Sequence, residues 1–508
     1  MARQRLRGKG LDTFTAPVEP SAAPNFQEAF QFVGMNTVAP ATRMPPGFSR
    51  LVRNMVFREG AYETREGTFT IGEASTTQQK GVFFAVFSSG TTQIYRFLND
   101  KVQKFEGIWS DSSGDPYTAD GLTHVSRTGW GDGAIISGQD GLYNLAFVGS
   151  GIVTAIADTP TGVIHLTTFN RRVIASTDTR IQWSVNGNSE DWTGLGSGYE
   201  DLRSTPGGVQ DRQTAVVPIT DGIALVIRSN SIWQMQPTGN FDAPFSFTML
   251  YSRIGSKYPK TVVGIPQGAI AANDQSIWLL TLSGFEDIGA PIRNLITGYG
   301  GYMNGAVAAY DEKWGEYRLA IGSRVLRYNL TSKLWTEDVY PFDIRDMAYG
   351  HYIQGVSPGG PDESTDVTGG FVYAPDGDGR LTIRDHVSVP MDVNAVGVET
   401  PITVRLETGN LIAENPLFRV GITEVQVEYE SDDDFTGIFE YSTDSGETWV
   451  LLSVQPFSAT GQPTLQSIMR WVERDTMQLS FSCAAAPNIR LIGMYPAVVK
   501  GARKGDAR

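Results

Sequence analysis

The 508-residue sequence is short of cysteine, histidine and charged residues, and each shortage excludes a class of protein. The single cysteine, Cys483, cannot form an internal disulfide, so it does not indicate an oxidising compartment and is interpreted as a buried structural thiol. The histidines are not at metal-ligand spacing; they are His124, His165, His351 and His386. Charged residues make up 19% of the chain, below the usual quarter, which disfavours a coiled coil or a long helical array.

The sequence also lacks a long hydrophobic run. No stretch of about 18 apolar residues occurs, so we expect no membrane-spanning helix. The basic residues within positions 1–10 are not followed by the apolar segment of a signal peptide. We therefore expect a soluble chain made in a reducing compartment. The net charge of −14 argues against a protein that grips nucleic acid through a basic face.

Turn-forming and apolar residues are abundant instead. The chain has 56 glycines, 26 prolines and 41% hydrophobic residues. Short apolar runs bounded by Gly, Asn, Asp or Ser recur, for example at residues 81–87, 223–227 and 277–282. Because long amphipathic helical stretches are nearly absent, the predicted fold class is all-β. A chain of this length is also expected to form two or three domains.

A short repeat of a small or polar, an aliphatic and an aromatic residue runs through the middle of the chain. Its copies are Gln93-Ile94-Tyr95, Gly141-Leu142-Tyr143, Arg180-Ile181-Gln182-Trp183, Ser231-Ile232-Trp233, Ser276-Ile277-Trp278 and Arg324-Val325-Leu326-Arg327-Tyr328. They recur at intervals of roughly 40 to 50 residues, the period of a four-stranded blade. We therefore predict a β-propeller of six to eight blades over residues 48–390, with outer copies around 61–63 and 379–381. Each repeated aromatic residue is expected to pack between adjacent blades, because one blade cannot bury both of its faces.

Three further segments flank the predicted propeller. Residues 1–47 are rich in proline and predict an extended N-terminal arm, with at most a short helix near 25–32; the arm is either a solvated linker or a strap along a neighbouring subunit. Residues 391–499 alternate apolar and polar side chains, which predicts a separate β-sandwich domain. Residues 500–508 form a basic tail.

Several segments match the start of a known catalytic or ligand-binding motif, but none of them completes it. Residues 194–198 place their serine one position late for a nucleophile elbow, and residues 298–301 lack the third glycine of a dinucleotide loop. Residues 376–379 resemble the start of a calcium loop but lack its remaining ligands, so a tight hairpin turn explains them better. We predict no catalytic, cofactor-binding or metal-binding residues, and no enzymatic activity.

Residues 442–449 match the Asp-box, S-x-D-x-G-x-x-W, which closes hairpins in sialidase-like propellers. Asp444 is expected to cap the backbone donors of the turn, Gly446 to adopt a positive φ, and Trp449 to cover the hairpin. The motif occurs once and inside the predicted sandwich, so it is weak support for sugar cleavage.

Three segments together resemble a known family. The first segment, residues 51–68, contains Asn54, Gly60 and the run Arg65-Glu66-Gly67-Thr68, and the second, residues 181–192, contains S-x-x-G-x-x-x-D-W. The third and looser likeness is residues 404–411, followed by the expected strand at 425–429 and the Asp-box hairpin. Their order along the chain is similar to that in the tail nozzle proteins of short-tailed bacteriophages, also called tail tubular protein B or packaged-DNA stabilisation proteins.

This resemblance implies a structural virion protein of the phage tail, assembled in the host cytoplasm. Its subunits would form a hexameric ring that docks on the tail adaptor and the portal, retains the packaged DNA and conducts genomic dsDNA during ejection; tail fibres are a further candidate partner. No cofactor is implied. The alternatives are another tail hub or adaptor protein, and a propeller that binds a host receptor or glycan.

The acidic body and the basic ends suggest where a nozzle subunit would act. An acidic channel would let DNA slide instead of sticking, although general solubility explains the same charge. The basic ends are candidate inter-ring or DNA contacts, or free solvated tails. These candidate residues are Arg3, Arg5, Arg7, Lys500, Arg503 and Lys504.

Overall fold

The computed structural model describes most of the chain between residues 25 and 503. The gaps are residues 27–33, 40–43, 45–47, 76, 87–91, 120–121, 123–124, 148–150, 203–210, 352–368, 377–381, 387–390, 395–396, 412–417, 475 and 484–488. Most of the predicted N-terminal arm and the outer repeat copy around 379–381 therefore lie outside the described residues. Residues 25 and 26, at the start of the predicted short helix, form a strand.

Strands dominate the described residues, which confirms the all-β class. The one α-helix in the described ranges is α1 (Arg293–Gly298), accompanied by the 3-10 turns η2 (Pro259–Thr261), η3 (Ala290–Ile292) and η4 (Met303–Gly305). No helix among the described residues is long and apolar enough to cross a membrane.

Seven small sheets, here called ring sheets 1 to 7, follow one another along the chain. Sheet 1 contains β7 (Gln79–Val86), β8 (Thr92–Leu98), β9 (Val102–Phe105) and β10 (Trp109–Asp111). Sheet 2 contains β12 (Arg127–Trp130), β13 (Gly133–Ser137), β14 (Leu142–Ala146) and β15 (Ile152–Ala155), with β11 (Ser113–Gly114) added beside β15. Sheet 3 contains β16 (His165–Phe169), β17 (Arg172–Ser176), β18 (Ile181–Trp183) and β19 (Gly198–Glu200). Sheet 4 contains β20 (Gln213–Thr220), β21 (Ile223–Arg228), β22 (Ser231–Pro237) and β23 (Phe245–Ser252).

The remaining ring sheets have the same antiparallel order. Sheet 5 contains β24 (Val263–Ile265), β25 (Gly268–Ala272), β26 (Ile277–Leu280) and β27 (Phe285–Asp287). Sheet 6 contains β28 (Val307–Asp311), β29 (Glu316–Ile321), β30 (Arg324–Asn329) and β31 (Trp335–Val339). Sheet 7 contains β32 (Ile344–His351), β33 (Gly369–Pro375), β34 (Thr382–His386) and, from the other end of the chain, β6 (Gly67–Ile71).

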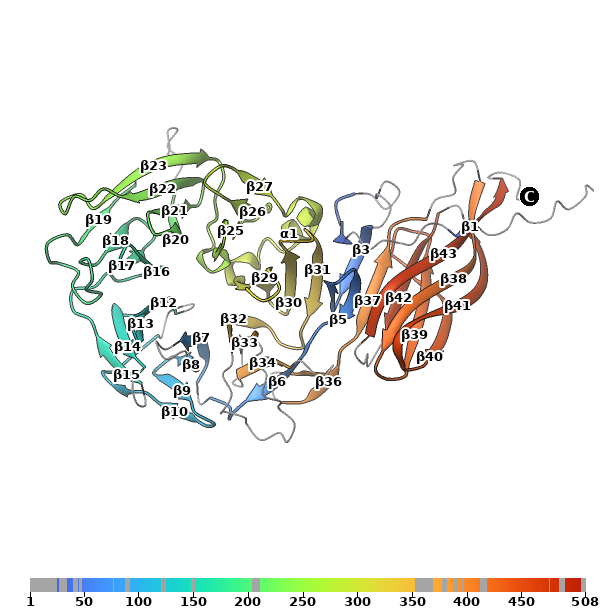
Figure 1. Ribbon diagram of the computed structural model, residues 1–508, viewed down its shortest axis with the longest axis horizontal. Helices are drawn as coiled ribbons and strands as arrows, with labels where there is room; N and C mark the ends of the chain where they lie inside the picture. The colour runs from blue at the N-terminus through green and yellow to red at the C-terminus, as the bar shows by residue number, and fades with distance from the viewer. Residues whose placement is uncertain are drawn as a thin grey trace, which may run out of the picture.

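Seven hydrophobic clusters fill the spaces between consecutive ring sheets and arrange them around a ring (Figure 1). The last cluster joins Val82 and Phe84 of sheet 1 to Val372 and Ala374 of sheet 7, so the ring is closed. The fourth strand of sheet 7 is β6, with Ile71 opposite Thr382. Because the closing strand comes from the start of the ring segment, the ring presents no long open sheet edge where its two ends meet.

The repeated aromatic residues pack between sheets, as expected. Five copies of the repeat lie on the third strand of their sheet, whereas Ile94 and Tyr95 lie on the second strand, β8. The Tyr95 ring stacks on Phe147 of sheet 2 with centroids 5.6 Å apart, and Trp183 of sheet 3 meets Phe245 of sheet 4 edge-on at 5.2 Å. The repeat thus marks residues that hold neighbouring sheets together.

A two-layer sandwich lies beside the ring (Figure 1). Its first sheet contains β4 (Met55–Arg58), β5 (Ala61–Thr64), β43 (Ile489–Arg503), β38 (Phe418–Ser431) and β41 (Thr460–Arg474), with β1 (Asn25–Phe26) paired to β43. Its second sheet contains β3 (Phe48–Arg53), β37 (Val404–Thr408), β42 (Gln478–Cys483), β39 (Phe435–Ser442) and β40 (Val450–Phe457). This sheet is continuous with sheet 6 of the ring, because Arg53 of β3 pairs with Glu337 of β31. The smaller elements are β2 (Gly34–Met35) on β3, and the hairpin of β35 (Met391–Val393) and β36 (Glu399–Pro401).

The strand pairing differs from the predicted domain boundaries at two places. Residues 48–64, which the sequence assigned to the propeller, pair with β37 and β43 of the sandwich, and Val52, Met55 and Tyr62 lie in its core. Residues 500–503, predicted as part of a tail, continue β43. In both cases a long-range partner decides the assignment, because the period of a strand does not encode which strand pairs with it.

Candidate functional site

The predicted basic contacts fall at the two ends of the chain. Arg3, Arg5, Arg7 and Lys504 lie outside the described residues. The backbones of Lys500 and Arg503 belong to β43, opposite Val420 and Phe418 of β38. The roles of these six residues stay predictions.

The segment that resembles the nozzle family, residues 51–68, forms the junction between the sandwich and the ring. Asn54 sits between β3 and β4 with a positive φ of 57°, a conformation that Asn adopts more readily than most residues. Its side-chain amide donates to the Thr403 carbonyl at 2.8 Å, and its Oδ1 accepts from the Val339 amide at 2.7 Å. Asn54 therefore links Val339, at the end of β31 in sheet 6, to Thr403, which directly precedes β37.

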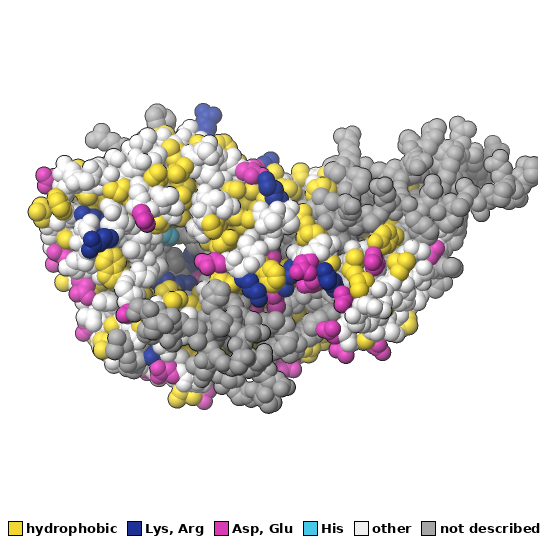
Figure 2. Space-filling view, viewed as in Figure 1, with side chains coloured by type: hydrophobic (Ala, Val, Ile, Leu, Met, Phe, Trp, Pro, Cys, Tyr) yellow, Lys and Arg dark blue, Asp and Glu magenta, His cyan; other side chains and the backbone are white. Residues whose placement is uncertain are grey.

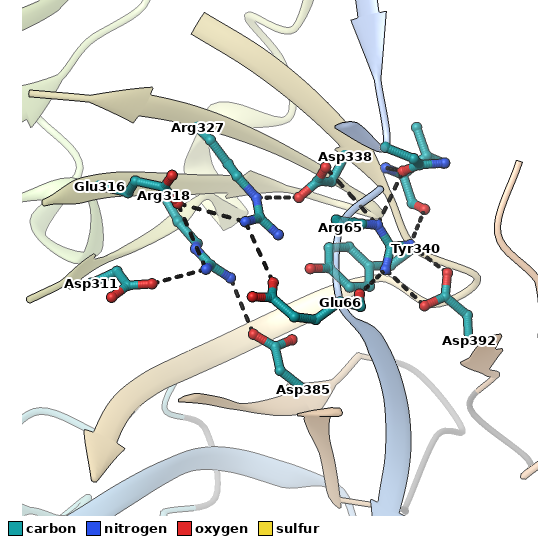
Figure 3. A network of polar contacts seen from close by, with 12 residues as sticks. Arg65, Glu66, Asp311, Glu316, Arg318, Arg327, Asp338, Tyr340, Asp385 and Asp392 are labelled. Atoms are coloured by element: carbon teal, nitrogen blue, oxygen red, sulfur yellow. Dashed lines mark hydrogen bonds and ion pairs between the residues drawn. The ribbon is translucent and has the colours of Figure 1, made fainter. Parts of the chain in front are cut away.

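Arg65 is fully buried in this junction and binds residues from the end of sheet 6 and from β35, which follows the ring (Figure 3). Its Nη1 donates to Asp392 Oδ1 at 2.8 Å, its Nη2 binds Asp392 Oδ2, and Nη2 also donates to the Val339 carbonyl at 3.0 Å. The guanidinium lies 4.2 Å from the centroid of the Tyr340 ring. A planar, two-pronged pairing of this kind is specific to arginine.

A second group of buried charges continues from Arg65 into the space between sheets 6 and 7 (Figure 3). Arg318 of β29 binds Asp311 at 2.9 Å within sheet 6 and Asp385 of β34 at 3.1 Å across the sheet boundary. Arg327 of β30 pairs with Asp338 of β31 and lies 3.6 Å from Glu316. We call these residues together with Arg65, Glu66 and Asp392 the junction network.

Asp385 and Glu66 of the junction network have pKa values moved in opposite directions. Burial raises the pKa of Asp385 to about 6, in spite of the Arg318 charge. Burial also opposes ionisation of Glu66, but Arg58, at 2.7 Å, and Arg327 outweigh it and lower the pKa of Glu66. Carboxylates with separated pKa values can act as acid and base, but here each faces an arginine of the network. The arrangement is therefore suited to holding sheets 6 and 7 and the junction together.

A separate group of charges lies where the innermost strands begin. Strands β12, β16, β20, β24, β28 and β32 contact one another in succession, and β32 contacts β7, so these strands surround the opening of the ring. Arg127 of β12 binds Asp346 of β32 at 2.6 Å, although sheet 1 separates their sheets. The same Asp346 oxygen accepts the Val82 amide of β7 at 3.0 Å.

Two more basic residues complete this group, which we call the axial cluster. Lys260 of η2 reaches the Arg345 carbonyl of β32 at 3.4 Å, and Arg345 Nε donates to Asp376 at 2.9 Å. Burial lowers the pKa of Lys260 to about 8, which the charge of Asp346 partly opposes. Figure 2 shows the opening in the middle of the ring, with basic and histidine side chains on its wall. The cluster joins residues that are far apart in the sequence but lie on the innermost part of the ring.

The Asp-box forms the predicted turn between β39 and β40. Asp444 Oδ1 accepts from the Ser442 hydroxyl at 2.7 Å and from the Thr448 amide at 2.9 Å, and its hydrogen bonds, led by that from the Thr448 side chain, lower the pKa of Asp444 to about 2. Gly446 has a φ of 87°. The predicted roles of Asp444 and Gly446 are confirmed, while Trp449 is half-buried and stacks on Arg405 at 5.1 Å.

The second family-like segment also forms a turn. Asp191 caps the amides of Thr193 and Gly194 at 3.1 and 2.7 Å, and the buried Trp192 donates its indole N–H to the Ser189 carbonyl at 3.0 Å. Gly187 has a φ of 77°. These residues therefore fix the connection between β18 and β19.

Within the described ranges, no group of three or more His, Cys, Asp and Glu side chains is arranged to hold a metal ion. The comparison with family models gave no match, and no curated protein matches the sequence.

Two solved structures give weak likenesses, both of the extracellular domain of BT4673 from B. thetaiotaomicron. The first, described as a one-component system, is 8% identical with a TM-score of 0.42, covering 85% of this chain and 61% of that one. The second, described as a hybrid two-component system, is 12% identical with a TM-score of 0.31, covering 71% and 56%. This chain thus spans less than two thirds of either structure, and nothing about its function is inferred from them.

Sequence reasoning missed most of the charges in both groups. Arg318 and Arg327 are each flanked on both sides by an apolar or aromatic residue within their strands, and a basic residue in such a position is a usable signal of a buried ion pair. Lys260 and Asp346 carry no such signal, because only the closed ring brings them together.

Proposed function

We propose that this chain is a structural virion protein of a short-tailed phage, a subunit of the tail nozzle ring that retains packaged DNA and conducts it during ejection. In this proposal the seven ring sheets are the blades of a seven-bladed β-propeller, and the chain has no catalytic role. Four-stranded antiparallel sheets in sequence order, apolar clusters between consecutive sheets and closure by β6 support the propeller.

The observation that carries the nozzle proposal is the position of the family-like segment 51–68. This segment supplies β3, β4 and β5 to the sandwich, the turn at Asn54, the buried Arg65 and the ring-closing β6. Asn54, Arg65 and Thr68, singled out by the resemblance, all make side-chain hydrogen bonds in the junction. The likeness thus lies in residues on which the architecture depends, not in an exposed loop.

The path of DNA follows from the axial cluster. Arg127 and Asp346, on the innermost strands of sheets 2 and 7, are in contact at 2.6 Å past sheet 1, and Lys260 reaches the same strand of sheet 7. A duplex whose major groove alone is about 12 Å wide does not fit through a passage whose innermost strands lie this close together. In the proposed ring the DNA therefore passes through a lumen formed by several copies, and the net charge of −14 disfavours its adhesion there.

Electron microscopy of negatively stained virions, with the chain labelled by a specific antibody, tests the proposal. We expect a sixfold ring on the tail axis. Label on the side of the tail, together with binding of the isolated protein to host cells or glycans, would favour the receptor-binding alternative. An axial ring at another level of the tail would favour the hub or adaptor alternative.

A further inference from the structure

Strand β40 is an open edge of the sandwich. It ends the second sheet and pairs on one side with β39; no described strand pairs with its other side. Its side chains Val450, Leu451 and Val454 are 49%, 58% and 51% exposed. Proteins usually protect such an edge with lysine or a covering element, because unpaired backbone groups beside apolar side chains invite another strand.

The surroundings of this edge are acidic. Six acidic residues, Asp432, Asp433, Asp434, Glu440, Asp444 and Glu447, lie on β39 or at its two ends, and two arginines, Arg50 and Arg405, contact this region from neighbouring strands. The exposed Asp432, Asp433 and Asp434 lie beside one end of β40, since Phe435 pairs with Phe457, and the Asp444 turn lies at the other end. Figure 2 shows acidic side chains along the lower border of the sandwich, where Figure 1 places β39 and β40.

Residues 1–10 have a charge opposite to that of the β40 edge, and their basic residues recur with the two-residue period of a strand. Residues 1–10 hold Arg3, Arg5, Arg7 and Lys9 and no acidic residue. Basic residues at every second position point to the same side of an extended strand, which is the arrangement that an acidic strand edge can bind. The 24 residues before β1 span at most about 80 Å when extended, which is enough to leave their own sandwich.

We propose that residues 1–10 of a second copy add as a strand to the free edge of β40, with their basic side chains against the acidic residues at its two ends. This docking rests on the proposed function, because a ring needs a contact between two different surfaces of the subunit that closes by rotation. It gives the basic N-terminus a partner in the neighbouring subunit rather than in DNA.

Cross-linking between two full-length variants tests the docking. Arg5→Cys and Val454→Cys are purified separately, mixed and oxidised with copper phenanthroline; the native Cys483 is buried. We expect a covalent dimer in the mixture and not in either variant alone. The double variant Arg5→Cys/Val454→Cys distinguishes docking between copies, which gives dimers and larger species, from docking within one chain, which gives a closed monomer.

A second substitution shows whether the edge itself is bound. Leu451→Lys in the Val454→Cys chain adds a repelling charge to the edge, and we expect roughly tenfold less covalent dimer. Leu195→Lys is the matched control, because Leu195 is 78% exposed on the ring and far from β40 in the strand order. It should leave the yield unchanged.

Absence of the mixed dimer, a closed monomer from the double variant, or equal yields with Leu451→Lys and Leu195→Lys would each overturn the docking. Each of these results is compatible with an axial ring in the virion. The electron microscopy therefore tests the proposed function independently of the docking.

Discussion

Arg65 and Asp392 are 327 positions apart in the sequence, yet the guanidinium of one binds both carboxylate oxygens of the other. Arg65 comes just before β6, where the chain enters the ring, and Asp392 lies in β35, where the chain leaves it for the sandwich. One buried ion pair, the Arg65–Asp392 pair, therefore joins the point where the chain enters the ring to the point where it leaves.

We expect Arg65→Met to lower the free energy of unfolding by about 3–5 kcal/mol, because it leaves the buried carboxylate of Asp392 without its cation. Urea denaturation measures the change. Arg180→Met is the control, since the Arg180–Asp201 pair is exposed and should contribute less than about 1 kcal/mol. Equal losses in the two variants would mean that the Arg65–Asp392 ion pair is not a determinant of stability.

Gly81→Ala tests the packing of the axial cluster. A Cβ at position 81 would come within 2.7 Å of Asp346 Oδ2, which Arg127 and the Val82 amide hold in place. We expect a loss of about 1–3 kcal/mol in thermal or urea unfolding. Gly129→Ala, on the neighbouring innermost strand with no atom within 4 Å of its Cβ, should cause no loss; a similar loss there would refute the steric explanation.

His165, at the start of β16, predicts a pH dependence. Burial lowers the pKa of His165 to about 4, against about 6.5 in the unfolded chain. Between these values the unfolded state binds more protons, so stability rises with pH and is lost as pH falls from 6.5 to 4, by up to about 3 kcal/mol. We expect the native protein to lose stability over this interval relative to His165→Gln, which does not titrate. Parallel curves for the two proteins in urea unfolding would rule out the lowered pKa of His165.

Deletion of residues 1–10 tests the role of the basic N-terminus in the particle. We expect less of the truncated chain in purified virions, measured by mass spectrometry, with an unchanged thermal unfolding curve. A chain with Arg3, Arg5 and Arg7 replaced by lysine keeps the charge and should enter virions normally. Full incorporation of the truncated chain would contradict the assigned role.

The sequence alone determined the features that depend on neighbouring residues. Short apolar runs between turn residues predicted strands, and the repeat around Tyr95 and Trp183 predicted residues that pack between sheets. Asp444 and Gly446 were assigned correctly because a turn is built from residues next to each other in the chain, so its donors and its positive φ can be read locally.

Only the tertiary structure decided which strands pair over long distances. Residues 55–64 have an ordinary strand pattern, but their partner β43 lies more than four hundred positions away, and β6 closes a sheet whose other strands come from residues 344–386. The same holds for the charges of the junction network and the axial cluster. Side-chain period fixes which face of a strand is buried, whereas the partner of that face depends on the closure of the whole chain, which no local pattern records.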